Sequence, residues 1–344
     1  MPSLIFIRFF LACLCYAMLT GCAPNAAMIP PAERTRLADT AIADAVTAYN
    51  AGNLERGDAG LKRAVILLTS GLDGGFSDEG YIAVAKRIME RGRPQDAIRL
   101  LEPLTPDKRV AWNPVLWATL ADAAEQASIP LRAAEARARA KQTAEFITQE
   151  FGATVPMAKD RAMEKAERAS RAGAYFDAYA KDYPRALEAC REAYRLLPND
   201  LYVANNLGYL LAEHGTTPDD YKEAVRLTQT VVEKAAPHPV FLDSFGWALY
   251  KRGDAKQKDH DGARRRLREA VDLAPDLFEC RYHLAVVYDA LEMPREALVE
   301  ARFAAKLKPD DANAKTLLTK LQSVVAALPS PAPSPTPSPT ATGK

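Results

Sequence analysis

The sequence is poor in the side chains on which most enzymes and metal sites depend. Its 344 residues include four histidines, three tryptophans and five cysteines. It has no His-Glu-x-x-His zinc pair, no phosphate-binding glycine loop and no nucleophile elbow. The only histidine between carboxylates, in Asp259-His260-Asp261, has no second histidine nearby and lies in a polar stretch expected to form a loop. We therefore expect no catalytic site, no metal and no cofactor.

Excess charge and long apolar segments are also missing. The chain has 45 Lys and Arg against 44 Asp and Glu, which gives no general attraction for nucleic acid, so no nucleic-acid partner is expected. Beyond the N-terminus no apolar run reaches the ~20 residues of a membrane-spanning helix. The basic cluster Arg264-Arg265-Arg266-Arg268 fits a solvated helix face, and lipid phosphates or an acidic partner are the alternatives.

Residues 1–21 have the pattern of a secretory signal peptide. A single charge, Arg8, precedes the apolar run Phe9–Leu19, which is too short to span a membrane comfortably. The segment ends in Leu19-Thr20-Gly21-Cys22, which resembles the processing box of bacterial lipoproteins. The resemblance implies cleavage before Cys22 and acylation of that residue, with the membrane as a partner through this lipid. An ordinary signal peptide that ends beside a cysteine is the alternative.

Two further features of this resemblance concern placement. Three acyl chains would attach the protein stably, because a single chain binds only marginally. The residue after Cys22 is Ala23 and not Asp, which by resemblance to enterobacterial sorting favours the outer membrane, facing the periplasm.

Of the remaining cysteines, Cys190 occupies a packing position and is expected to be a buried thiol, and no disulfide with Cys280 is expected.

The sequence is rich in a motif that recurs about every 34–39 residues in its C-terminal half. A small residue follows a large apolar one in each unit, further small or apolar residues come downstream, and a proline closes several units. These positions are Gly208, Gly246 and Ala285, then Ala224, Ala263 and Ala297, then Val231, Ala270 and Ala304, and finally Pro198, Pro275 and Pro309. The preceding unit, 167–200, has a degenerate first helix, in which Ala174 is expected to be the small residue. The motif resembles the tetratricopeptide repeat (TPR), a helix–turn–helix unit that stacks on its neighbours.

The motif has a steric basis. Two antiparallel helices approach closely only where a small residue on each lets the backbones come near, and proline stops the second helix. We therefore predict an all-α fold, an α-solenoid of TPR helix–turn–helix repeats with a C-terminal capping helix. A non-repeating, alanine-rich helical domain is the alternative. Polar insertions at Gly215–Asp220 and Asp254–Asp261 are expected to be loops between helices.

The predicted organisation has six parts. They are a lipoprotein signal peptide (1–21), a lipidated tether (22–36), an N-terminal degenerate TPR-like helical region (37–166), the TPR repeats (167–311), a capping helix (312–328) and a Pro-rich disordered tail (329–344). The tail alternates proline with small residues and has too little apolar surface to fold. It fits a plain spacer, and glycosylation or recognition by a partner are the alternatives.

In TPR arrays the first helix of each repeat lines a concave groove. Mapping that property onto this chain gives an aromatic and amide-rich stripe. Its candidate binding residues are Tyr202, Asn205, Asn206, Tyr209, Asp243, Ser244, Trp247, Tyr250 and Tyr282, with Arg171, Tyr175, Tyr179 and His283 on the same faces. Tyrosine and tryptophan give contact area at low entropic cost, and asparagine can pair with both polar groups of a peptide backbone. Burial of these rings between repeats is the alternative.

The stretches Asn206-Leu207-Gly208-Tyr209 and Leu242–Tyr250 also resemble a group of bacterial outer-membrane TPR lipoproteins. That resemblance implies a periplasmic scaffold or adaptor that binds a protein or peptide in the concave groove. In one branch such adaptors bring substrates to a C-terminal-processing protease, and others serve assembly. A permanent structural subunit of an envelope export or secretion complex is the competing hypothesis.

Overall fold

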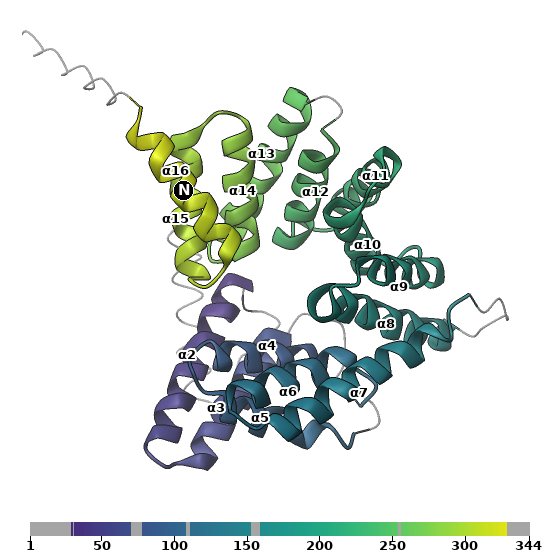
Figure 1. Cartoon of the computed structure of the whole chain (residues 1–344), viewed down its shortest axis with the longest axis vertical. Helices are drawn as coiled ribbons and strands as arrows, with labels where there is room; N and C mark the ends of the chain where they lie inside the picture. Colours follow the sequence, from purple (N-terminus) through teal and green to yellow (C-terminus); the bar gives the residue numbers. More distant parts are fainter. Residues whose placement is uncertain are drawn as a thin grey trace, which may run out of the picture. The chain divides into compact units, whose positions relative to one another are not determined.

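The structure, a computed structural model, describes residues 29, 31–69, 78–107, 111–152, 159–253 and 256–328. The predicted signal peptide, Cys22 and the Pro-rich tail lie outside these residues. Throughout the described ranges all regular structure is helical, so the predicted all-α fold is confirmed (Figure 1). No helix in this part of the chain combines the length and apolar character needed to cross a bilayer. The chain forms two compact units, Met1–Leu207 and Gly208–Lys344, and each is described by itself.

Unit 1 consists of helices that pack in antiparallel pairs. They are α2 (Pro31–Asn50), α3 (Leu54–Thr69), α4 (Asp78–Met89), α5 (Pro94–Leu101), the 3-10 turn η2 (Glu102–Leu104), α6 (Pro114–Gln126), α7 (Pro130–Thr148), α8 (Lys159–Tyr175), the π-helical turn η3 (Phe176–Ala180) and α9 (Tyr183–Leu196). Helices α2, α4, α6 and α8 each pack on the helix that follows, and α4, α6 and α8 also contact one another in succession. Helix α2 begins inside the stretch assigned to the tether.

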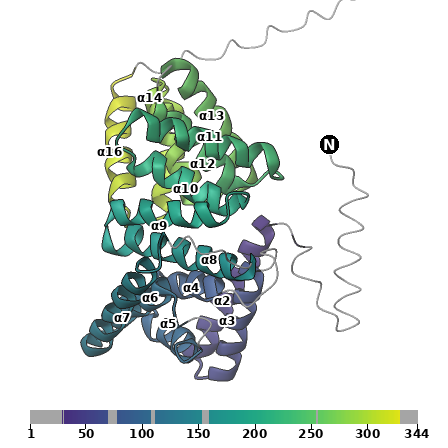
Figure 2. The ribbon, with the colours of Figure 1, turned by 90° about the vertical axis from the view of Figure 1, so that its right-hand side faces the viewer.

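Unit 2 repeats this arrangement. Helix α10 (Leu201–His214) crosses the boundary between the units, and α11 (Pro218–Lys234), α12 (Pro239–Arg252), α13 (Lys256–Leu273), α14 (Phe278–Ala290), α15 (Pro294–Leu307) and α16 (Ala312–Ala326) follow. Helix α12 pairs with α13 and α14 with α15, and the first helices α12 and α14 also touch (Figures 1 and 2). Helix α16 packs on α15 and α14, with Ala314 and Leu321 buried. These stacked helix pairs form the predicted TPR-type solenoid architecture.

The small residues of the motif lie where paired helices meet. A Cβ atom added at Gly208 would be 2.7 Å from Cγ2 of Thr228 on α11, and one at Gly246 would be 2.7 Å from Cγ of Leu267 on α13. In both cases the next contact is a backbone oxygen, of Ala224 at 3.3 Å or of Ala263 at 3.2 Å. Neither approach leaves room for a side chain, which confirms the steric basis of the repeat.

In the pair of α8 and α9 the small residue at the helix contact lies one position before the predicted one. From the alanine pattern we predicted Ala174 as its small contact residue, but Ala174 is exposed. Gly173 is the contact, because a Cβ there would be 2.7 Å from Sγ of Cys190 on α9. The first helix ends in the π-helical turn Phe176–Ala180 and reverses at Lys181, whose φ of 53° is left-handed. The standard repeat spacing, which assumes a regular helix, does not apply to this turn.

Both predicted insertions are shorter than expected, and in this respect the prediction is wrong. Only Gly215–Thr217 separates α10 from α11, since Thr217 and Asp220 form a capping box that begins α11. From Lys256 onward the second insertion is the start of α13. His260 is buried there, with its ring centroid 5.1 Å from that of Tyr250. Polar composition does not separate a loop from a helix when one face of that helix packs against a neighbour.

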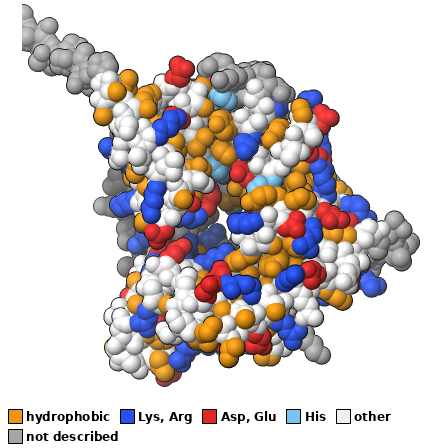
Figure 3. Space-filling view, viewed as in Figure 1, with side chains coloured by type: hydrophobic (Ala, Val, Ile, Leu, Met, Phe, Trp, Pro, Cys, Tyr) orange, Lys and Arg blue, Asp and Glu red, His pale blue; other side chains and the backbone are white. Residues whose placement is uncertain are grey.

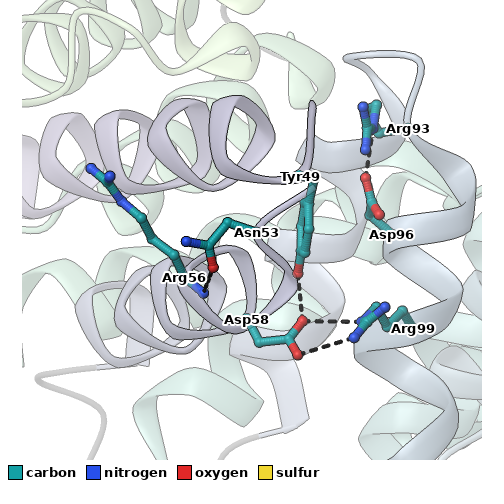
Figure 4. Close-up of polar contacts among 7 residues, drawn as sticks. All are labelled: Tyr49, Asn53, Arg56, Asp58, Arg93, Asp96 and Arg99. Carbon is teal, nitrogen blue, oxygen red and sulfur yellow. Dashed lines mark hydrogen bonds and ion pairs between the residues drawn. The ribbon is translucent and has the colours of Figure 1, made fainter. Parts of the chain in front are cut away.

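A polar cluster joins the first two helix pairs of unit 1 (Figure 4). The Tyr49 hydroxyl donates a 2.7 Å hydrogen bond to Oδ1 of Asp58, and Nε of Arg99 on α5 donates to the same oxygen at 3.1 Å. The hydrogen bond from Tyr49 is the main cause that lowers the pKa of Asp58. The Tyr49 ring lies against Gly57, where a Cβ would approach its Cε1 to 2.2 Å. Asp58 therefore connects α2, α3 and α5 without any loop contact.

Candidate functional site

The aromatic stripe of unit 2 lies on the first helices of successive pairs. Seven side chains from α10, α12 and α14 form a network that we call the Trp247 cluster. It consists of Tyr209, Glu213, Asp243, Trp247, Tyr250, Tyr282 and His283. In the space-filling view, hydrophobic side chains with histidines among them gather over α12 to α14 (Figure 3). Because α12 and α14 touch, residues about 40 positions apart in sequence become neighbours.

Asp243 and His283 form the buried polar centre of the Trp247 cluster. Nδ1 of His283 lies 3.0 Å from both carboxylate oxygens of Asp243, and the residues are 4% and 5% exposed. A carboxylate only accepts hydrogen bonds, so Nδ1 of His283 carries a hydrogen and donates a hydrogen bond to Asp243. Cys280 lies one turn before His283 on α14, and its thiol also donates a hydrogen bond to Asp243. Burial is the main cause that raises the pKa of this thiol, and the charge of Asp243 is the next. These contacts fix the histidine ring in one orientation.

Trp247 lies flat on this histidine. The two ring centroids are 4.1 Å apart with the planes 17° from parallel, and Tyr250 stacks on Trp247 at 5.1 Å. Nε1 of Trp247 donates a 2.6 Å hydrogen bond to Oε2 of Glu213. Trp247 is only 6% exposed, so most of its surface is covered. Its indole N–H is already used in the hydrogen bond to Glu213. Its stacking on His283 and its hydrogen bond to Glu213 join α12 to α14 and to α10.

The accessible part of the Trp247 cluster is formed by three tyrosines. Tyr209, Tyr250 and Tyr282 are half-buried. Burial raises the pKa of Tyr282, and the nearby charges of Asp311 and Glu213 raise it further. Burial likewise raises the pKa of Tyr250, with Asp289 adding to it. Both phenols therefore keep their protons at neutral pH and can donate hydrogen bonds to a ligand oxygen.

The remaining predicted site residues differ in exposure. Tyr202 and Asn206 on α10 are exposed, and Ser244 on α12 is buried. Asn205 is 3% exposed, and its Oδ1 has no hydrogen-bond partner in the described part of the protein. An unpaired buried carbonyl raises the free energy of the folded protein. A hydrogen-bond donor that reached Oδ1 of Asn205 would remove this cost. A role for these residues in binding stays a prediction.

Glu213 is the one member of the Trp247 cluster that the sequence analysis missed. It lies four residues after Tyr209, so both fall on one helix face, and that spacing could have indicated it. Its partner Trp247 is 34 positions away, and only the stacking of pairs brings the two together.

The described cysteines are buried thiols. Cys190 and Cys280 are free and buried, as predicted for Cys190, and burial raises the pKa of the Cys190 thiol to about 12. Within the described ranges no three His, Cys, Asp or Glu side chains gather closely enough to bind a metal ion. What the Trp247 cluster supplies is a rigid surface with hydrogen-bonding tyrosines at its edge.

Comparison with known proteins gives structural likenesses only. No family model matches the chain, and no curated protein matches its sequence. Among solved structures, a TPR protein from Parabacteroides merdae is 10% identical, with a TM-score of 0.45 over 83% of this chain and 99% of that one. The human IFIT1 dimer with m7Gppp-AAAA is 16% identical, with a TM-score of 0.47 over 86% of this chain and 69% of that one.

A third likeness is to the Cut9–Hcn1 hetero-tetramer of the APC/C, at 16% identity and a TM-score of 0.44, over 84% of this chain. This chain spans about half, 53%, of the matched chain's length. At such identities and scores none of these likenesses bears on function.

Proposed function

We propose that this chain is a lipid-anchored adaptor of the bacterial periplasm, without enzymatic activity, whose first-helix face binds a peptide segment of a partner protein. The observation that carries the proposal is the Trp247 cluster. Successive helix pairs contribute to one aromatic surface there, and buried hydrogen bonds hold it rigid before any ligand arrives. Preorganised aromatic surfaces of this kind bind with little loss of conformational entropy.

The chemistry of the surface favours an extended peptide. Tyr209, Tyr250 and Tyr282 offer ring edges for apolar side chains, and the hydroxyls of Tyr250 and Tyr282 can donate to backbone carbonyls. Lys251 lies over the Trp247 ring, 5.4 Å from its centroid, and adds a positive charge near the edge. An envelope protease or an assembly factor is the proposed kind of partner, by the resemblance of residues 200–310 to outer-membrane TPR lipoproteins.

The proposed location depends on the N-terminus. The sequence Leu19-Thr20-Gly21-Cys22 supports processing as a lipoprotein, and Ala23 supports sorting to the outer membrane. Two or more acyl chains on Cys22 would attach the helical units to the membrane surface stably.

A comparison of crosslinked partners tests the adaptor function. The wild-type chain and the double variant Tyr209→Ala, Tyr282→Ala are crosslinked in native envelopes, purified and analysed by mass spectrometry. The control is Phe303→Ala on α15, which removes an aromatic side chain that is 46% exposed on a second helix. Circular dichroism establishes that all three chains keep their helix content.

We expect partners that the double variant loses and the Phe303→Ala control keeps. Partner sets that are the same for all three chains would refute binding at this face. A partner present at fixed stoichiometry in every preparation would indicate a permanent subunit of a complex and not an exchanging adaptor.

A further inference from the structure

A second site of different character lies in unit 2. A cavity of about 1040 Å³ opens beside α13, lined by residues of that helix and by Tyr288 of α14. None of its lining residues belongs to the Trp247 cluster. Three of them are Arg264, Arg265 and Arg268, part of the basic cluster that the proposed function does not use.

The cavity has an excess of positive charge. Two carboxylates, Asp261 and Glu269, also line it. Glu269 accepts a 2.9 Å hydrogen bond from Arg266, which is not a lining residue and whose guanidinium lies over the Phe245 ring. Asp261 is 3.7 Å from Arg264, a long separation for an ion pair. Three guanidinium groups therefore line the cavity against two carboxylates, and one of these, Glu269, is already paired with Arg266 outside the lining.

Two of the arginines are prepared for an anion. Nη1 of Arg268 donates a 2.6 Å hydrogen bond to the Tyr288 hydroxyl, which fixes its guanidinium against α14. Nε of Arg264 is buried and has no hydrogen-bond partner among the described residues. The Arg264 side chain as a whole is 43% exposed, so its guanidinium can donate to an oxyanion in the cavity. Arg264 and Arg268 are one helical turn apart and face the same side.

We propose that this cavity binds a phosphate group, presented by a phosphorylated small molecule or by a phospholipid headgroup. Several guanidinium groups around one cavity match the tetrahedral oxygens of phosphate, to which arginine donates in pairs. A smaller neighbouring cavity of about 450 Å³ shares Arg268 and Tyr288, but its lining also includes the carboxylates of Asp272, Glu296 and Glu300. It is therefore not part of the proposed phosphate site. The site is independent of the peptide face.

The test compares two arginines of unit 2. Arg265→Gln removes a lining charge, and Arg226→Gln removes the same charge from an exposed position on α11 that lines neither cavity. The full chain and both variants are titrated with inorganic pyrophosphate by calorimetry, at low ionic strength and again with added salt. We expect saturable binding that Arg265→Gln weakens about tenfold, as for the loss of one charge-assisted hydrogen bond, and that Arg226→Gln leaves within about twofold. Arg268→Gln should weaken binding at least as much.

Vesicles separate the two sources of phosphate. Co-sedimentation with phosphatidylglycerol vesicles is compared with phosphatidylcholine vesicles for the same two variants, since any contribution of the N-terminus is common to both. An Arg265-dependent preference for phosphatidylglycerol assigns the site to a lipid headgroup, and binding of pyrophosphate without that preference assigns it to a soluble phosphorylated ligand. The proposal is wrong if neither probe binds, or if Arg265→Gln and Arg226→Gln weaken binding equally.

Discussion

The close approach of α12 and α13 predicts that an added methyl group at Gly246 destabilises unit 2. In Gly246→Ala the new Cβ would lie 2.7 Å from Cγ of Leu267 and 3.2 Å from the backbone oxygen of Ala263. Leu267 is fully buried and Cγ is its branch point, so relief requires the two helices to move apart. Overpacking of this kind costs about 1–3 kcal/mol.

The same helix pair offers a matched control. Gly262 on α13 also lies inside a helix, but a Cβ there would meet only Cδ1 of Leu249, at 3.3 Å, the flexible end of a side chain. Replacing either glycine by alanine gains about 1 kcal/mol in helix propensity. This gain cancels in the comparison, so Gly246→Ala should be about 1–3 kcal/mol less stable than Gly262→Ala.

Urea unfolding measures this difference. Far-ultraviolet circular dichroism follows the helices, and the fluorescence of Trp247, next in sequence to Gly246, follows its surroundings. Equal stabilities of the two variants, or a Gly246→Ala protein more stable than the wild type, would refute the view that small residues set the distance between paired helices.

Three further predictions concern other parts of the chain. Tyr49→Phe removes the hydrogen bond to Asp58 and should lower the free energy of unfolding of unit 1 by about 1 kcal/mol, measured by urea unfolding; no change would show that this bond is not stabilising. The hydrogen bonds from Arg195 lower the pKa of Glu192, so the carboxylate's contribution to stability is present above its unfolded pKa of about 4.3 and is lost as pH falls through its lower folded value. In Glu192→Gln the free energy of unfolding should therefore fall less steeply as pH drops below roughly 4.3. The same pH dependence in both proteins, measured by urea unfolding at several acidic pH values, would contradict this. Cys22→Ser should leave the precursor uncut and without acyl chains by mass spectrometry, whereas normal processing would exclude lipoprotein maturation.

The fold could be predicted because its determinants are local. Gly208, Gly246 and the alanines after them recur at the spacing that close helix packing requires, and the structure places them at the contacts. The prediction was wrong where a helix departs from regular geometry, as in the π-helical turn after Tyr175 that moves the contact to Gly173. It was also wrong where polar composition suggested a loop, as at His260, which packs on Tyr250.

The candidate site was harder to predict because its contacts are not local. The pairs Asp243 with His283 and Trp247 with Glu213 join residues 40 and 34 positions apart. Sequence spacing placed most of these side chains on the first-helix face, but it could not show that Asp243 and Trp247 are buried there by their own partners. The sequence also named Tyr209, Tyr250 and Tyr282, but only the structure shows that these rings stay partly accessible.

Photo-crosslinking from single positions tests the central claim most directly. A photoreactive phenylalanine analogue is placed at Tyr282, on the first-helix face of α14, or at Phe303, on the second helix α15, and the cells are irradiated. The account predicts a discrete protein adduct from position 282 and none from position 303. Adducts from position 303 with none from 282 would contradict it and assign partner binding to the second helices.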